Sequence, residues 1–243
     1  MLASPLLGKE DIELGDETII NDFHYKNNVL NANVNVRLGF LRKVYSLLLV
    51  QLLVTISVGV VFTFDPMIRL YIHNNDWLIS LTFLLTVGIL IALHIHRNHH
   101  PLNLILLAAF TIVEALSLSV LVTFYDLQVV LQALFLTLFV VISLTAFTFQ
   151  TKRDFSAAGF GLFAALLILF LASFLQIIIG SSLLEFGISL GGALLFSLFI
   201  IYDTQMLMKH VSPEEYILAT INLYLDIINL FIHILRLLEV ARR

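Results

Sequence analysis

The chain has 243 residues, of which 60% are hydrophobic and only 12% are charged, and its mean hydropathy is +1.00. About a quarter of the residues of a soluble domain are charged, so this composition excludes a water-soluble fold and indicates that lipid surrounds most of the chain. The absence of cysteine excludes disulfides and thiolate metal sites. The small net charge of −4 gives no reason to expect a nucleic-acid partner.

The first 35 residues differ in character from the rest of the chain. They are polar, acidic and rich in Asn, and they lack the basic start and immediate apolar run of a signal peptide. We predict that 1–35 form a mobile cytosolic tail and that 36–243 form one transmembrane domain.

Seven apolar runs follow, each close to the ~20 residues that a helix needs to cross a hydrocarbon core about 30 Å thick. The predicted spans are 44–64, 77–96, 102–124, 127–149, 157–180, 184–208 and 215–238. Because the connections between them are short, neighbouring helices should be antiparallel. The predicted fold class is therefore an all-α integral membrane bundle of seven transmembrane helices.

Basic residues gather on one side of the predicted bundle, and cationic loops stay in the cytosol, so the amino terminus is predicted to be cytosolic. These residues are Arg37, Arg42, Lys43, Arg97, Lys152, Arg153 and Lys209, whereas the loops of the other side contain only Arg69.

The last segment does not follow this rule. A seventh complete crossing would place Arg242 and Arg243 on the non-cytosolic side, so the segment either spans fully or enters and returns. We favour a full helix, because Ser212 and Pro213 form a strong helix start.

Three acids lie at membrane depth, where each costs roughly 2.5–3.5 kcal/mol and usually serves a function. They are Glu114, Asp203 and Asp226, and none has an Arg or Lys nearby in its own span. Counted along their helices, Asp203 and Asp226 differ in depth by about 10 Å, so the spacing alone does not show that they meet; tilt, or a break in one helix, would close this gap. If the two meet, one proton is shared and the pair titrates as a unit, which makes a proton-controlled latch between two helices.

The last span carries a polar stripe. Asn222, Asp226, Asn229 and His233 are spaced four, three and four residues apart, which places them on one helical face. A polar face on an apolar helix should look into the bundle or into a wet path. Interhelical hydrogen bonding without transport is the alternative.

Two acids outside the Asp203–Asp226 pair, Glu185 and Glu114, are candidates for an ion path. Glu185 opens the sixth span, and the glycines that follow it would allow a close helix approach; these are Gly187, Gly191 and Gly192. Together with three other non-cytosolic acids, Glu185 is expected to form an acidic vestibule that concentrates cations; the three are Asp65, Asp76 and Asp126. The alternative is that these acids are solvated turn residues. Glu114 has Thr111 and Ser117 one turn away, and these hydroxyls would solvate it.

Oxygen ligands without cysteine suit a hard cation such as Ca²⁺. Asp203 and Asp226, even with Asn222 and Asn229, supply fewer than the about six to eight oxygens that Ca²⁺ prefers. The predicted metal site at Asp203 and Asp226 is therefore weak, which suits passage of the ion rather than storage. Four histidines in the second cytosolic loop more often form a polar cuff than a metal site.

Several motifs together resemble the transmembrane Bax-inhibitor-motif family, also called Lifeguard proteins. They include Leu223-Tyr224-Leu225-Asp226, Ile201-Tyr202-Asp203-Thr204, Ser212-Pro213-Glu214-Glu215 and Lys152-Arg153-Asp154-Phe155, with further similarity at 40–46, 101–104 and 122–126. The resemblance runs from about residue 36 to the carboxyl end.

This resemblance implies a seven-helix fold with the last helix central. It further implies a Ca²⁺ leak from Golgi and endoplasmic-reticulum stores, protection from apoptosis, a pH-sensing pair at Asp203 and Asp226, and a pore-lining acid at Glu185. The expected partners are Ca²⁺, protons and membrane lipid, with Ca²⁺-release channels or apoptosis regulators as further partners. No cofactor is expected, and Ca²⁺ is the transported ion.

Two other functions remain open. A non-conducting adaptor would use the same acids for folding alone and would act on other Ca²⁺ channels or death regulators. An intramembrane aspartyl protease would explain two membrane aspartates, but the glycines before the second Asp and the Pro-Ala-Leu motif of such enzymes are missing. We therefore expect a protein that is not an enzyme.

Overall fold

The computed structural model describes residues 34–75, 77–97 and 99–242. The predicted tail at 1–35 lies outside this part of the chain except for its last two residues, which begin the first helix. The described helices are α2 (Val34–Phe64), α3 (Pro66–His73), α4 (Trp77–His96), α5 (Leu102–Val122), α6 (Leu127–Gln150), α7 (Gly159–Ile179), α8 (Ser182–Lys209) and α9 (Tyr216–Arg242), with short 3₁₀ turns at Ser156–Ala158 and Pro213–Glu215.

Seven of these helices are long and apolar enough to cross a membrane, which confirms the predicted fold class. Most of the predicted boundaries lie within a few residues of the observed ones. The largest error is at α2, which begins at Val34 rather than at 44. Arg42 and Lys43 thus lie on the helix, because both are good helix formers and their exposed side chains reach water from its surface.

Helix α3 is an element that the sequence analysis did not predict. Asp65 caps it, since its Oδ1 accepts hydrogen bonds from the backbone N–H groups of Met67 (2.8 Å) and Ile68 (3.2 Å), and Pro66 occupies the first turn. Asp followed by Pro is a typical helix start, so the signal was present in the sequence.

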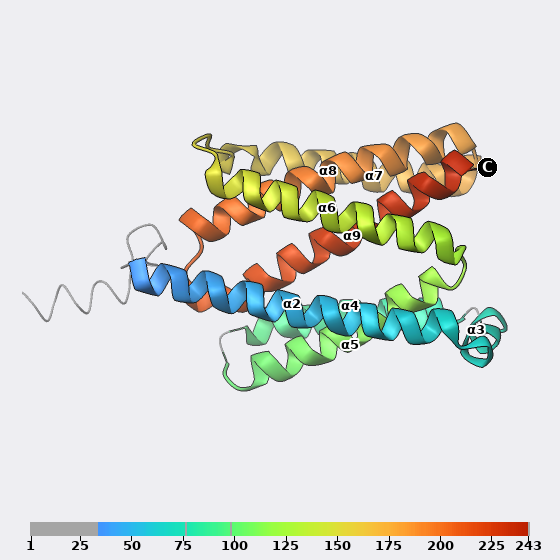
Figure 1. The fold of residues 1–243 in the computed structure, drawn as a ribbon, viewed down its shortest axis with the longest axis horizontal. Helices are drawn as coiled ribbons and strands as arrows, with labels where there is room; N and C mark the ends of the chain where they lie inside the picture. The colour runs from blue at the N-terminus through green and yellow to red at the C-terminus, as the bar shows by residue number, and fades with distance from the viewer. Residues whose placement is uncertain (1–33, 76, 98, 243) are drawn as a thin grey trace, which may run out of the picture.

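The seven spanning helices alternate in direction, and α9 runs diagonally between two groups of helices (Figure 1). One group contains α2, α4 and α5, and the other contains α6, α7 and α8. Helix α9 packs against α2, α5, α6 and α8, and most of its side chains are buried. The expectation that the last helix is central is confirmed.

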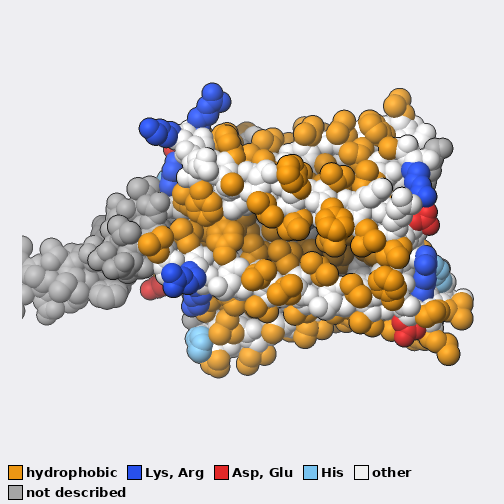
Figure 2. Space-filling model, in the orientation of Figure 1, with side chains coloured by type: hydrophobic (Ala, Val, Ile, Leu, Met, Phe, Trp, Pro, Cys, Tyr) orange, Lys and Arg blue, Asp and Glu red, His pale blue; other side chains and the backbone are white. Residues whose placement is uncertain are grey.

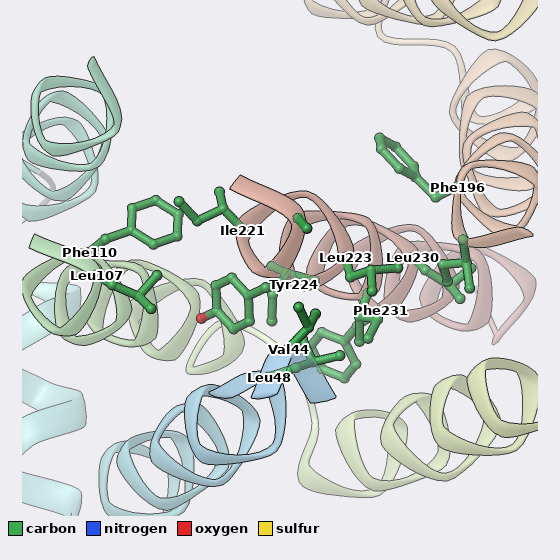
Figure 3. Close-up of a cluster of buried hydrophobic side chains, with 14 of the residues drawn as sticks. Val44, Leu48, Leu107, Phe110, Phe196, Ile221, Leu223, Tyr224, Leu230 and Phe231 are labelled. Atoms are coloured by element: carbon green, nitrogen blue, oxygen red, sulfur yellow. The ribbon is translucent and has the colours of Figure 1, made fainter. Parts of the chain in front are cut away.

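The core is centred on Tyr224 of α9 (Figure 3). Its side chain is fully buried and its hydroxyl hydrogen-bonds Thr55 of α2 at 2.8 Å. Its ring meets Phe110 of α5 edge to face, with 6.0 Å between the ring centroids. These contacts fix α9 to α2 and α5, while Val44 and Leu48 of α2 fill the space beside them.

Charged side chains lie at the two ends of the bundle, and an apolar band separates them (Figure 2). We call the end that contains Arg42, Lys43, Arg97, Lys152, Arg153 and Lys209 the basic end, and the opposite end, with Asp65, Asp126 and Glu185, the far end. Helix α9 is continuous and ends at the far end, so the last segment is a full helix and does not turn back. There Arg242 Nη1 lies 3.1 Å from Asp126 Oδ2.

Candidate functional site

The side chains of Asp203 on α8 and Asp226 on α9 lie within hydrogen-bonding distance of each other. Asp226 is buried, and no N–H or O–H group of the described residues other than Asp203 donates a hydrogen bond to its Oδ2. The two helices that carry these side chains cross at an angle (Figure 1). Their side chains meet although the count along the two helices placed them about 10 Å apart in depth.

The two helices approach closely at Gly192 of α8. A Cβ atom at Gly192 would overlap the imidazole ring of His233 on α9, so only glycine leaves room for this ring. His233 is buried and stacks on Phe196 of α8, with 5.5 Å between the ring centroids. Gly187 and Gly191, which were also expected to allow a close approach, face open space.

The polar stripe of α9 is only partly directed into this contact. Asp226 and His233 are buried, and Asn229 is half-buried and donates a hydrogen bond to the carbonyl of Leu225 in its own helix (2.8 Å). Asn222 is exposed, so of the two expected surroundings of the stripe, the bundle interior or a wet path, the interior does not apply to this residue. The stripe is therefore covered at Asp226 and open one turn nearer the basic end.

Further polar groups continue from the carboxyl pair toward the far end. Ser189 lies on the same face of α8 as Gly192 and Asp203, and its buried Oγ has no hydrogen-bond partner among the described residues. Nδ1 of His233 is likewise buried without a partner there. Glu185, one turn beyond Ser189, is half-buried. We call this α8–α9 contact, from Glu185 through Ser189, Gly192, Phe196 and His233 to Asp203 and Asp226, the seam.

Sequence reasoning missed Gln205, the side chain that connects the loop at the basic end to the seam by hydrogen bonds. Gln205, two residues from Asp203, donates a hydrogen bond to the carbonyl of Arg153 (2.6 Å) and accepts one from the backbone N–H of Phe155. The backbone N–H of Ser156 donates to Asp154 and is the main reason that the pKa of this carboxyl is lowered; Lys209, 3.7 Å away, adds to the effect. The sequence signal for this contact was the presence of a polar residue, Gln205, on a predicted spanning helix.

Glu114 lies apart from the carboxyl pair. Its carboxylate accepts a hydrogen bond from Thr86 of α4 at 3.1 Å, so it belongs to the α4–α5 contact. The expectation that Thr111 solvates Glu114 is wrong. The hydroxyl of Thr111 accepts from Gln51 (2.9 Å) and donates to the carbonyl of Leu107 (2.8 Å), because Thr111 faces α2.

The predicted acidic vestibule is also partly engaged in other contacts. Asp65 caps α3, Asp126 pairs with Arg242, and Asp76 lies outside the described residues. Within the part of the chain that the structure describes, no three His, Cys, Asp or Glu side chains are grouped so as to hold a metal ion. A cation at the carboxyl pair would thus have two carboxylates and would need water or backbone oxygens as well.

Comparisons with known proteins agree over almost the whole chain. Residues 37–243 match the family described as inhibitor of apoptosis-promoting Bax1. The Golgi anti-apoptotic protein of vaccinia virus (strain Lister) and protein lifeguard 4 of Mus musculus are each 48% identical over 226 residues, covering 93% of this chain and 95% of the relative. Bax inhibitor 1 of Schizosaccharomyces pombe is 34% identical over 237 residues, covering 97% of this chain and 89% of the relative.

Proposed function

Because the chain belongs to the family of inhibitors of apoptosis-promoting Bax1, as its motifs predicted, we propose that it is a Ca²⁺ leak channel of Golgi and endoplasmic-reticulum membranes. By lowering the Ca²⁺ content of these stores it inhibits apoptosis. Its amino terminus and its basic end face the cytosol, following the distribution of Lys and Arg. The observation that carries the proposal is the contact between Asp203 and Asp226 inside the bundle.

Two carboxylates cannot both be ionised at low cost in contact with each other in a medium of low dielectric constant. Among the described residues, no Lys or Arg acts on either member of the pair, and each feels only its partner carboxyl and burial. The pair must therefore share a proton or receive a cation from outside. Ca²⁺ suits two carboxylate oxygens, and a site with so few protein ligands binds it weakly enough to release it.

The proposed route of the ion between the two ends of the bundle follows the seam. On this route Ca²⁺ entering from the far end would meet Glu185, then the hydroxyl of Ser189, which has no partner among the described residues, and then the stacked rings of Phe196 and His233. Beyond the carboxyl pair, the exposed Asn222 marks the opening toward the basic end. Asn229 remains a further candidate for contact with the ion, whereas Glu114 lies outside this route.

Protonation controls this route through the carboxyl pair. A shared proton holds α8 and α9 together by a hydrogen bond between the two side chains. Loss of this proton leaves two negative charges that repel each other and attract a divalent cation. Ca²⁺ flux should therefore increase as the pH rises through the titration of the pair.

The test is Ca²⁺ efflux from liposomes that contain only the purified protein, followed with a fluorescent indicator between pH 5 and 8. We expect Asp226→Asn and Asp203→Asn to lower efflux at least tenfold and to remove its pH dependence. Asp154→Asn is the matched control, because Asp154 is an exposed loop acid outside the seam whose lowered pKa keeps it ionised throughout this range. Efflux from Asp226→Asn equal to that of the wild type would refute the proposal.

The same experiment separates the alternatives. A non-conducting adaptor for Ca²⁺-release channels or apoptosis regulators gives no efflux from liposomes at any pH. The contact of two membrane aspartates also suits an aspartyl protease, so incubation of the purified protein with a transmembrane substrate peptide is a necessary control. Cleavage that Asp226→Asn abolishes would favour the enzyme over the channel.

A further inference from the structure

A mostly apolar cavity that contains the carboxyl of Glu114 lies between α4 and α5, on a different side of α9 from the seam. It has a volume of about 530 Å³ and is lined by Ile79, Ser80, Phe83, Leu84, Glu114, Ser117, Leu118, Leu121 and Ile232. Ile232 and His233 are consecutive on α9, so their side chains point about 100° apart and line separate spaces. The cavity is therefore independent of the seam and of the function proposed for it.

The cavity lies in the half of the bundle near the far end. Ser80 is in the first turn of α4, about 5 Å from its start, and Glu114 lies eight residues before the end of α5, about 12 Å deep. Phe83 and Leu84, at the rim, are 63% and 66% exposed, so the cavity opens sideways to the bilayer. A molecule in the membrane reaches Glu114 without entering the protein from water.

The lining selects among possible occupants. Six of the nine lining side chains are apolar, whereas a hydrated Ca²⁺ ion needs about six to eight oxygen ligands and an aqueous surface. Thr86 donates the one hydrogen bond that Glu114 accepts, and no Lys or Arg among the described residues acts on this carboxyl. The best partner for a carboxylate in such apolar surroundings is an ammonium group attached to an apolar chain.

We propose that this cavity binds a long-chain amine of the bilayer, with its ammonium group on Glu114 and its alkyl chain along Phe83 and Leu84. The hydroxyls of Ser80 and Ser117 are available for hydroxyl groups next to the amine, so a long-chain amino alcohol fits best. A volume of about 530 Å³ is within the ~300–1,000 Å³ that ligand pockets in proteins occupy.

The test uses an amino alcohol with an alkyne and a photoreactive diazirine in its chain, added to the full chain in phosphatidylcholine nanodiscs. After illumination, label should map to 77–84 of α4 and 114–121 of α5. Glu114→Gln, which keeps the size and removes the charge, should lower labelling at least fivefold. The N-acetylated probe, which is neutral and has the same chain, should label the wild type no better than the amine labels Glu114→Gln.

Two further variants make the result decisive. Glu239→Gln changes an acid of the same half of the bundle outside the cavity and should label like the wild type. Ser80→Phe fills the mouth from an exposed position and should abolish labelling while Glu114 stays in place, which covers the case in which Glu114→Gln does not fold. Equal labelling by the amine and the amide, labelling of Glu114→Gln within twofold of the wild type, or label elsewhere in the chain would overturn the proposal.

Discussion

Replacement of Gly192 by Ala should destabilise the protein by disrupting the contact between α8 and α9. The added Cβ would overlap the imidazole of His233, which cannot move aside because it is buried and stacked on Phe196. Overpacking of this kind costs about 1–3 kcal/mol. For a chain of this size each kcal/mol lowers the melting temperature by about 2–4 °C, so the expected loss is about 2–12 °C.

Thermal melting in detergent, followed by size-exclusion chromatography of a fluorescent fusion, measures this loss. Gly191→Ala is the matched control, because it makes the same substitution one residue away in open space and should not lower the melting temperature. Combining Gly192→Ala with His233→Ala removes the overlap, so the double variant should lose less than the sum of the single losses. If Gly192→Ala melts like Gly191→Ala, the close approach of the two helices at this point is refuted.

Two further variants test contacts on other sides of the bundle. Tyr224→Phe should lower the free energy of unfolding by only about 0.6 kcal/mol, because Thr55 keeps its own hydrogen bond to the backbone carbonyl of Gln51. Thermal melting should show this loss when Thr55 is present and no such loss in a Thr55→Val background. Gln205→Ala removes both hydrogen bonds between Gln205 and the loop at the basic end, so trypsin should cut after Arg153 several times faster than in the control Gln150→Ala, which changes an exposed residue. Equal cleavage rates in the two variants would contradict the role of Gln205 in holding this loop.

The spans and the fold class were predictable because the length of an apolar run and the thickness of a bilayer fix each other. The central place of α9 has a physical signal as well. It is the least apolar of the seven spanning helices and carries Asp226 and His233, and a helix with such side chains is stable in a membrane only when other helices cover it. The burial of these two side chains follows directly from that requirement.

Contacts between helices could not be predicted in the same way, because crossing angles depend on packing along the whole interface. Counting residues along upright helices placed Asp203 and Asp226 about 10 Å apart in depth and therefore did not predict the contact of their side chains. Three glycines of α8 looked equivalent in sequence, yet only Gly192 faces a neighbouring helix. Glu114 has a hydroxyl on its own helix one turn away on either side, but Thr86 of another helix is its partner.

The two sides of α9 should therefore respond differently to mutation. Tyr224 and Asp226 are two residues apart, so their side chains point about 200° apart around the helix axis. Tyr224 packs against α2 and α5 through contacts that hold the bundle together, whereas Asp226 meets a second carboxyl that adds charge rather than packing. A change at Tyr224 should lower stability and leave the pH dependence of Ca²⁺ flux in place. Asp226→Asn should abolish that pH dependence without lowering stability, because it replaces a repelling or proton-sharing pair by an amide that donates a hydrogen bond to the carboxylate of Asp203.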